Sequence, residues 1–135
     1  MLDAFLVSPN TVVTAKGDSA PVDLSAAANR VFLATISISA VVEQESLEIS
    51  FFTSADGTTW DTKPAVSCPQ KFYAGEYPFL VDLSDAPDAK FVRAHWEVAR
   101  WGRGPTEPHF EFGLRLREVP SQELIEAKAE ASLRR

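Results

Sequence analysis

The chain has 135 residues, 45% of them hydrophobic and 24% charged, which is the composition of one globular domain. Its net charge of −6 argues against nucleic acid as the main partner, because affinity for the phosphate backbone comes from Lys and Arg. No run approaches the ~18 apolar residues needed to span a bilayer, and residues 1–5 lack a basic signal-like start, so we expect neither a membrane partner nor a secretory signal.

The first 29 residues predict short strands joined by turns. Pro9-Asn10 and the turn at 16–19 interrupt the apolar pattern, because Pro, Asn and Gly favour turns. Strands are expected at residues 2–7 and 11–16, with an edge-like strand at 21–25, and residues 26–29 fit one helical turn or a loop.

Two long alternating strands follow. The first, at residues 30–40, has an apolar face made of Phe32, Ala34, Ile36 and Ile38. A polar connection at 41–46 leads to the second, in which Leu47, Ile49 and Phe51 share a face. A strand, a short polar connection and another strand together predict a hairpin.

The second half of the chain predicts three more strands with period-two alternation. Their inward sets are Tyr77, Phe79, Val81 and Leu83; then Val92, Ala94, Trp96 and Val98; then Phe110, Phe112, Leu114 and Leu116. The last two strands flank a loop rich in Gly and Pro at 99–108, and we expect them to be neighbours in a final hairpin. About eight strands at these spacings predict an all-β fold, an antiparallel β-sandwich of jelly-roll type.

The tail differs in character from the rest of the chain. Ser121 suits a helix N-cap, Glu123 follows in the first turn, and Arg134 and Arg135 come last, which complements the helix dipole. We therefore divide the chain into a sandwich domain at 1–119 and a short C-terminal α-helix within 120–135. Its apolar stripe is thin, so the helix either packs on the sandwich, docks on a partner or frays.

Oxygen-bearing side chains gather in the turn after residue 53. Asp56 and Asp61, with the hydroxyls of Thr58 and Thr59, supply the ligand type that calcium or a sugar requires. The EF-hand spacing of acids is absent, however, and an ordinary turn in which Asp56 bonds to backbone amides is the favoured interpretation.

The residue types of a catalytic centre are scarce. His95 and His109 are the only histidines, and no third metal ligand or nucleophile is suggested by their spacing, so a solvated sheet face with cross-strand charge pairs is favoured. Cys68 is the single cysteine, which excludes an intrachain disulfide, favours a reducing compartment and suits a structural thiol. We expect no enzyme activity, no cofactor and no metal.

A basic zone with an aromatic residue is expected near the last two strands. It consists of Arg93, Arg100, Trp101, Arg103, Arg115 and Arg117. Such a zone stacks on nucleobases or sugars, or binds an acidic surface. Glu43, Glu45 and Glu48 would supply an acidic surface within the same chain, which makes head-to-tail self-association a hypothesis.

The three tryptophans have different expected places. Trp96 lies on an apolar strand face and belongs to the core, while Trp60 closes the turn and packs against it. Trp101 stands in the Gly- and Pro-rich loop, and an exposed aromatic side chain in a loop is the single residue we favour as a binding anchor.

Two short motifs carry a resemblance to known families. They are the S-x-D-G-x-x-W turn at residues 54–60 and the strand opening K-F-V-R-A at 90–94. With the alternating strand at 32–38, the chain resembles small phage and prophage virion-associated β-sandwich proteins over residues 11–117. It is more distantly similar to discoidin or galactose-binding-like sandwiches, but it lacks the paired cysteines of secreted discoidin modules and departs from both groups in its tail.

The first resemblance implies a non-enzymatic structural or interaction protein, an oligomeric virion or assembly component found in the virion or the cytoplasm. Its partners would be copies of itself or other assembly proteins. The second implies a carbohydrate-binding module, with a glycan bound through Asp56, Trp60 and Trp101. Fold-level analogy alone does not decide between them.

Overall fold

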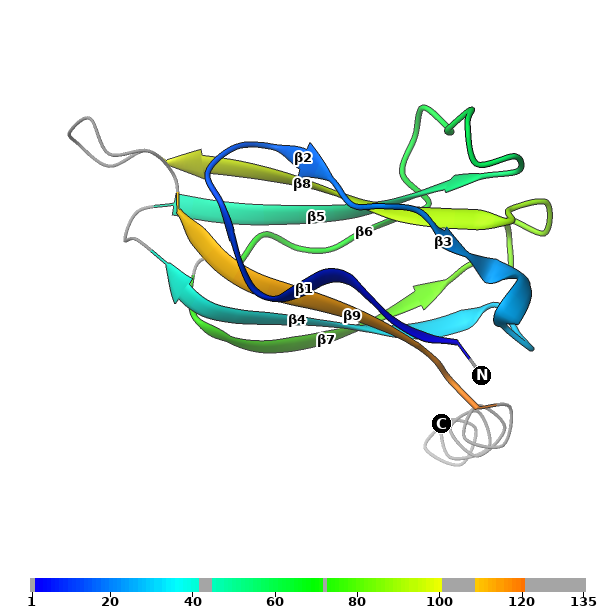
Figure 1. Ribbon diagram of the computed structural model, residues 1–135, viewed down its shortest axis with the longest axis horizontal. Helices are drawn as coiled ribbons and strands as arrows, with labels where there is room; N and C mark the ends of the chain where they lie inside the picture. The colour runs from blue at the N-terminus through cyan, green and yellow to red at the C-terminus, as the bar shows by residue number, and fades with distance from the viewer. Residues whose placement is uncertain (1, 42–44, 72, 101–108, 121–135) are drawn as a thin grey trace, which may run out of the picture.

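The computed structural model describes residues 2–41, 45–71, 73–100 and 109–120. These residues form an all-β structure of two antiparallel sheets that lie face to face, which the β-sandwich architecture fits (Figure 1). The strands are β1 Asp3–Val13, β2 Gly17–Asp18, β3 Val22–Asp23, β4 Val31–Val41, β5 Glu45–Ser54, β6 Val66–Ser67, β7 Gly75–Asp82, β8 Phe91–Arg100 and β9 Phe110–Glu118.

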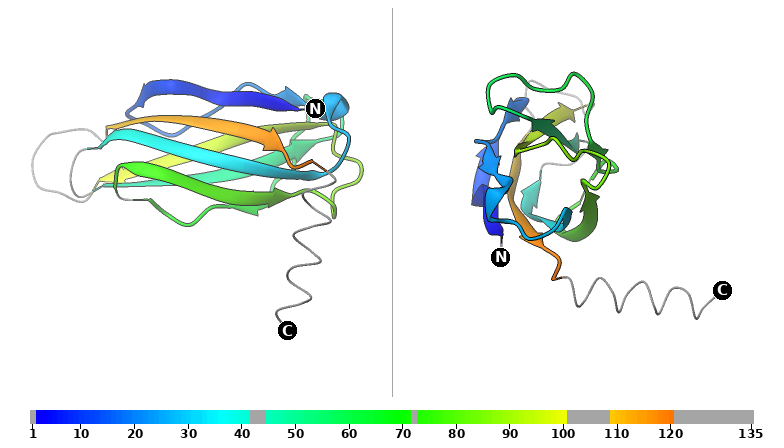
Figure 2. Two further views of the ribbon diagram at one scale, coloured as in Figure 1. Left: turned by 90° about the horizontal axis from the view of Figure 1, so that it is seen from below. Right: turned by 90° about the vertical axis from the view of Figure 1, so that its right-hand side faces the viewer.

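Sheet A has the strand order β1-β9-β4-β7, so β1 and β7 are its edges (Figure 2, left). Sheet B has the order β2-β8-β5-β6, and the short β3 also pairs with β8. Pro78 lies in the edge strand β7, where a missing backbone donor is tolerated. One 3-10 turn, Leu24–Ala26, follows β3 and is capped by Asp23, whose Oδ1 accepts a hydrogen bond from the Ser25 backbone N–H at 2.8 Å.

The core lies between the two sheets and is made by the alternating residues that the sequence indicates. Phe32 and Phe112 of sheet A and Phe51 of sheet B are fully buried. Burying each aromatic side chain contributes about 2–3 kcal/mol. The inward sets of β4, β5 and β9 are buried throughout, while Tyr77, Phe79, Trp96 and Val98 are partly buried at the margin. Period-two alternation therefore predicted correctly which face of β4, β5, β7, β8 and β9 is inside.

Both predicted hairpins are wrong. β4 belongs to sheet A and β5 to sheet B, so the connection after β4 crosses from one sheet to the other. β8 and β9 are likewise in different sheets. The alternation of apolar and polar residues predicts which face of a strand is buried, but it does not predict which strand pairs with it.

Two further expectations concern the ends of the chain. The two N-terminal strands are one strand, β1, with register irregularities between Phe5 and Val7 and between Val7 and Thr11. Asn10 there takes a φ of 60°, which lets the chain bulge and continue. The predicted C-terminal helix lies outside the described residues, apart from Pro120. No helix in the described ranges has the length and apolarity to cross a membrane.

In the described part of the chain two glutamates are buried, and each accepts hydrogen bonds from backbone amides of distant segments. Glu118 Oε1 accepts from the Leu2 N–H at 3.0 Å, and its Oε2 accepts from Ala28 and Asn29 at 2.9 and 3.0 Å. Glu45 Oε2 accepts from the His109 N–H at 2.8 Å. These carboxylates satisfy amides that strand pairing leaves unbonded.

Candidate functional site

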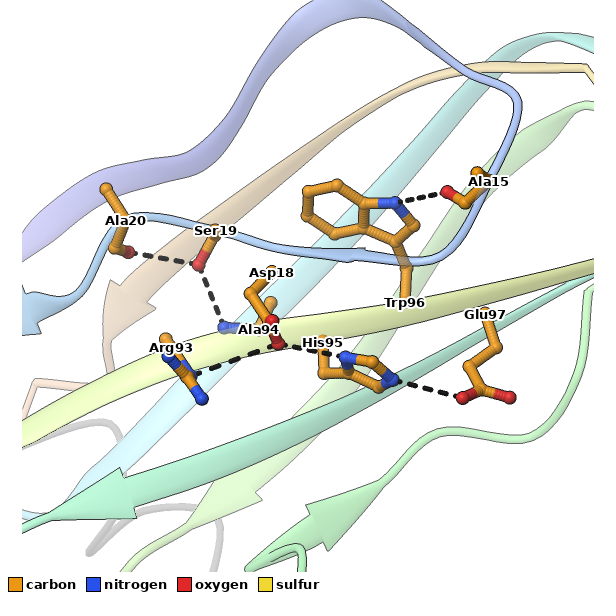
Figure 3. Close-up of polar contacts among 9 residues, drawn as sticks. All are labelled: Ala15, Asp18, Ser19, Ala20, Arg93, Ala94, His95, Trp96 and Glu97. Atoms are coloured by element: carbon orange, nitrogen blue, oxygen red, sulfur yellow. Dashed lines mark hydrogen bonds and ion pairs between the residues drawn. The ribbon is translucent and has the colours of Figure 1, made fainter. Parts of the chain in front are cut away.

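The outer face of sheet B carries a row of polar side chains, Arg93, His95 and Glu97, on alternate residues of β8 (Figure 3). Their partners across the ladder on β5 are Phe52, Ser50 and Glu48. Arg93, which the sequence predicts as a site residue, belongs to this row and forms an ion pair with Asp18 at 3.9 Å. The row is the first candidate site.

His95 is the centre of this group. Its Nδ1 lies 2.9 Å from Asp18 Oδ1, and its Nε2 lies 3.2 Å from Glu97 Oε1. The neutral imidazole donates to one of these carboxylates, whereas the protonated ring donates to both. The imidazole ring of His95 also packs against the Phe52 ring in an edge-to-face arrangement. The two centroids are 6.0 Å apart, and the ring planes meet at 88°. Both ring nitrogens of His95 are therefore engaged by side chains of the protein itself.

Asp18 reaches His95 because the short strand β2 lies along β8. Gly17 pairs with Trp96 and Asp18 with His95. A Cβ on Gly17 would be only 2.8 Å from the Trp96 ring, so the indole needs a glycine at this position. The Trp96 Nε1 donates to the Ala15 carbonyl at 3.1 Å, which fixes the start of the same segment (Figure 3).

Ser19 continues this attachment where regular pairing stops. Its backbone N–H donates to the Ala94 carbonyl at 2.8 Å, and its Oγ accepts from the Ala94 N–H at 2.9 Å. The same hydroxyl donates to the Ala20 carbonyl at 3.0 Å. In the gap between β2 and β3, the Ser19 side chain thus replaces a backbone ladder bond to β8.

Arg93 stacks on Trp60. The guanidinium carbon lies 4.4 Å from the centroid of the indole ring, a cation–π arrangement. Its Nε is 3.9 Å from Asp18 Oδ1 and, within the described part of the chain, is buried without a hydrogen-bond partner. Trp60 therefore packs, as expected from the sequence, but against an arginine of the neighbouring sheet face.

The polar side chains on the outer face of sheet B attach β2 to β8. Ser50, the ladder partner of His95, directs its hydroxyl toward Ser67 Oγ at 3.3 Å. In the described ranges, no group of three His, Cys, Asp or Glu side chains is placed to hold a metal ion. Cys68 is buried, which raises the pKa of its thiol, so it suits packing and not nucleophilic attack.

The turn after β5 has the hydrogen bonds that the ordinary-turn interpretation predicted. Asp56 Oδ1 accepts from the Thr59 and Thr58 backbone N–H groups at 2.8 and 2.9 Å, and the Ser54 hydroxyl donates to it at 3.0 Å. These donors hold the pKa of Asp56 far below its usual range. Asp61 Oδ2 accepts from the Thr53 hydroxyl at 3.0 Å. Both carboxylates are therefore engaged within the loop.

The single basic zone predicted from the sequence is divided by the fold. Arg93 is on β8 of sheet B, whereas Arg115 and Arg117 are on β9 of sheet A. Arg100 ends β8, its side chain is outside the described structure, and Trp101 and Arg103 lie outside the described residues.

Charges near this expected zone are partly neutralised. Arg115 forms two hydrogen bonds with Asp3, from Nε to Oδ1 at 2.8 Å and from Nη2 to Oδ2 at 2.5 Å. This pairing lowers the pKa of Asp3 and raises that of Arg115. The acidic surface expected opposite is also incomplete, because Glu45 is buried and Glu43 lies outside the described residues. His109 precedes β9 and does not share a sheet with His95.

A hollow of about 590 Å³ lies on the outer face of sheet A, away from the core. Its floor comes from β4 and β9, with Thr35, Ser37 and Ser39 alternating with the buried residues of β4. Phe5, the Pro9 bulge and Asn10 form one wall, and Gly75 and Glu76 form the other. Sequence reasoning missed this hollow and also missed Asp18, because both depend on which strands become neighbours.

Comparison with known proteins adds no relative: no family model and no curated protein matches the chain.

Proposed function

We propose that the chain is a non-enzymatic structural or interaction protein, an oligomeric virion or assembly component of phage type, with a jelly-roll sandwich. It would act in the virion or, before assembly, in the cytoplasm, with copies of itself or other assembly proteins as partners. The observation that carries the proposal is the distribution of exposed apolar side chains on the edges of sheet A.

The strand pairing supports the jelly-roll fold. If β2 and β3 count as one interrupted strand, the described residues form eight strands. The first pairs with the last, β1 with β9, and the next pairs inward are β2 and β3 with β8, β4 with β7, and β5 with β6. This nesting is that of one long antiparallel hairpin rolled into two sheets. Jelly rolls of this kind serve as viral capsid domains and as lectin domains.

Exposed large apolar residues support assembly. Among the described residues they are Phe5 and Val12 on β1, Leu80 on β7 and Tyr73 just before β7, each at least half exposed. β1 and β7 are the two edges of sheet A. Apolar and aromatic side chains on opposite edges are what a chain needs to contact a second copy on each side.

The two edges differ, so the contact would be head-to-tail. A contact between β1 of one copy and β7 of the next leaves a free edge on each, which closes into a ring or extends into a filament. Pro78 and the Pro9 bulge interrupt both edges. We therefore expect side-chain packing and not a continuous backbone ladder between copies.

Native mass spectrometry and light scattering test this proposal. The full chain should form a defined oligomer, and Phe5→Ser or Leu80→Ser alone should give monomers, because every head-to-tail contact uses both edges. An equimolar mixture of the two variants should form heterodimers only, since just one intact contact is possible. Lys63→Ser, at an exposed position in the loop after β5, is the control and should assemble normally.

Two outcomes would count against edge-mediated assembly. The full chain could stay monomeric from low to high concentration and salt, or both edge variants could assemble as the wild type does. Removal of residues 121–135 is the companion experiment. Loss of the oligomer on this deletion, with edge variants unaffected, would assign the contact to the predicted C-terminal helix instead.

A carbohydrate-binding module is the second candidate function. The turn residues Asp56 and Asp61 do not favour it, because their carboxylates are already bonded within the loop. The face of Trp60 is likewise covered by Arg93. The observation that favours it is the hollow on sheet A, whose floor offers hydroxyl groups and whose wall offers an exposed aromatic ring.

A further inference from the structure

We propose that the hollow on the outer face of sheet A binds a neutral oligosaccharide. This site rests on the second candidate function, carbohydrate binding, and shares Phe5 with the edges proposed for assembly. It differs from the Asp56, Trp60 and Trp101 site that the sequence predicts.

The hollow is lined by residues of four strands, β1, β4, β7 and β9. β1 departs from the ladder at Pro9, and Pro9 Cα lies 2.9 Å from the place of a Cβ on Gly113. Because Gly113 has no side chain, the bulge rests on the sheet and forms a wall above the floor of β4. A volume of about 590 Å³ is in the range of ligand-binding sites, and the open shape suits an extended ligand.

The floor is a row of hydroxyl groups. Thr35, Ser37 and Ser39 are at alternate positions of β4, so neighbouring hydroxyls recur about every 6.8 Å along the strand. A hydroxyl both donates and accepts, as do the hydroxyls of a sugar. Ser39 Oγ bonds to Glu111 at 3.1 Å, whereas those of Thr35 and Ser37 have no partner within the described part of the chain.

The wall adds an apolar surface. Phe5 lines the hollow with 53% of its surface exposed. The face of an aromatic ring is electronegative and attracts the weakly positive C–H groups on one side of a sugar ring. A hydroxyl floor beside an exposed aromatic wall therefore matches the two kinds of surface that a sugar presents.

The charges favour a neutral ligand. Among the described residues that line the hollow, Arg115 is the only cation, and both of its bonded nitrogens are directed to Asp3. Glu76 on the opposite wall adds a negative charge. With the cation neutralised and an acid nearby, phosphate, sulfate and carboxylate groups are not attracted, so the proposal commits to an uncharged saccharide.

The first experiment uses the full chain and a panel of neutral hexasaccharides, namely cellohexaose, maltohexaose, xylohexaose and mannohexaose. Isothermal titration and amide chemical shifts are measured up to millimolar ligand. We expect one sugar to bind, with shifts concentrated at Thr35, Ser37, Glu76 and Gly113. If no panel member binds, carbohydrate binding fails as a function, and the site fails with it.

The second experiment locates the site. Thr35→Val with Ser37→Val removes two hydroxyls and places β-branched side chains, which suit a strand, at both positions; it should weaken binding at least tenfold. Thr14→Val is the control, at an exposed position just after β1 and outside the hollow, and should bind as the wild type does. Thermal unfolding of each variant checks that the fold is kept.

The outcomes separate the site from the function. Binding that the double variant leaves unchanged would overturn this site but keep carbohydrate binding. Shifts at Thr35 and Ser37 on simple dilution, without sugar, would assign the hollow to a second copy of the chain and overturn the proposal. Binding only to charged glycans, lost in high salt, would overturn the neutral ligand.

Discussion

Pro9 packs directly on Gly113: its Cα is 2.9 Å, and its nitrogen 3.3 Å, from the position that a Cβ on Gly113 would occupy. The bulge in β1 thus fits the space that the missing side chain of Gly113 leaves on β9. The contact keeps β1 on sheet A through the irregular stretch between Val7 and Thr11, where the register shifts. It also sets the wall of the hollow on that sheet.

Gly113→Ala should destabilise the protein by about 1–3 kcal/mol, because the added methyl group forces the Pro9 backbone away from β9. Chemical denaturation gives the change in the free energy of unfolding. Arg117→Ala, an exposed position on the same strand, is the control and should change it by less than about 0.5 kcal/mol. Equal stability of the two variants would show that β1 accommodates a side chain here.

Glu118→Gln should destabilise the protein at pH 7 by about 1–3 kcal/mol, because a neutral amide serves three backbone donors poorly. Burial alone would raise the pKa of Glu118, but the three N–H donors outweigh it and hold the pKa below its usual value. A carboxyl with a lowered folded pKa stabilises above its unfolded pKa, about 4.3, and this stabilisation is lost as pH falls through the folded pKa.

The difference in unfolding free energy between wild type and Glu118→Gln should therefore be constant from pH 7 to about 5 and shrink below about 4.3. Denaturant titrations across that range measure it. Glu48→Gln, an exposed change on sheet B, should run parallel to the wild type. A Glu118→Gln curve parallel to wild type at every pH would mean that the carboxylate has no special role.

Asp18→Asn should loosen the attachment of β2 without unfolding the sandwich. The substitution weakens the bond to His95 Nδ1, and the neighbouring Ser19 N–H donates to the Ala94 carbonyl at 2.8 Å. Amide hydrogen exchange at Ser19 should accelerate about tenfold or more, while the exchange at Phe51 and Phe112 stays slow. Glu97→Gln leaves β2 untouched and provides the comparison. Unchanged exchange at Ser19 would assign the attachment to the backbone bonds alone.

Arg93 and Trp60 should be energetically coupled. A double-mutant cycle of Arg93→Gln and Trp60→Leu should give a coupling of about 0.5–1 kcal/mol, the value of a partly exposed cation–π pair. The free energy of unfolding of the four proteins supplies the cycle. A coupling of zero within error would show that the stacking at 4.4 Å adds nothing to the free energy of unfolding.

The sequence predicted much of what is local in this fold. Alternation placed Phe32, Phe51 and Phe112 in the core, and the S-x-D-G-x-x-W turn predicted the bonds from Asp56 to nearby amides. Each of these features depends on residues close together in the chain. Pro78 lies on the edge strand β7, where the missing ladder donor is tolerated.

What sequence reasoning could not provide was partnership across long separations. Arg93 and Arg115 both point outward from alternating strands, and nothing local shows that their strands lie in different sheets. In the sequence, Glu45 and Glu118 resemble surface acids. In the fold, their carboxylates accept hydrogen bonds from the backbone amides of His109, Leu2 and Asn29. The contact of Asp18 with His95 spans 77 positions and has no signal within either segment.

The pairing of β1 with β9 has a consequence for biosynthesis. β1 is synthesised before β9, the strand that it joins, which lies about a hundred residues later in the chain, so one edge of sheet A stays open while the residues between them are made. Contacts between such distant segments slow folding, because chain entropy is lost before the contacts form. We therefore expect the nascent protein to depend on holdase chaperones, which would shield the unpaired edge of β4 until β9 is synthesised.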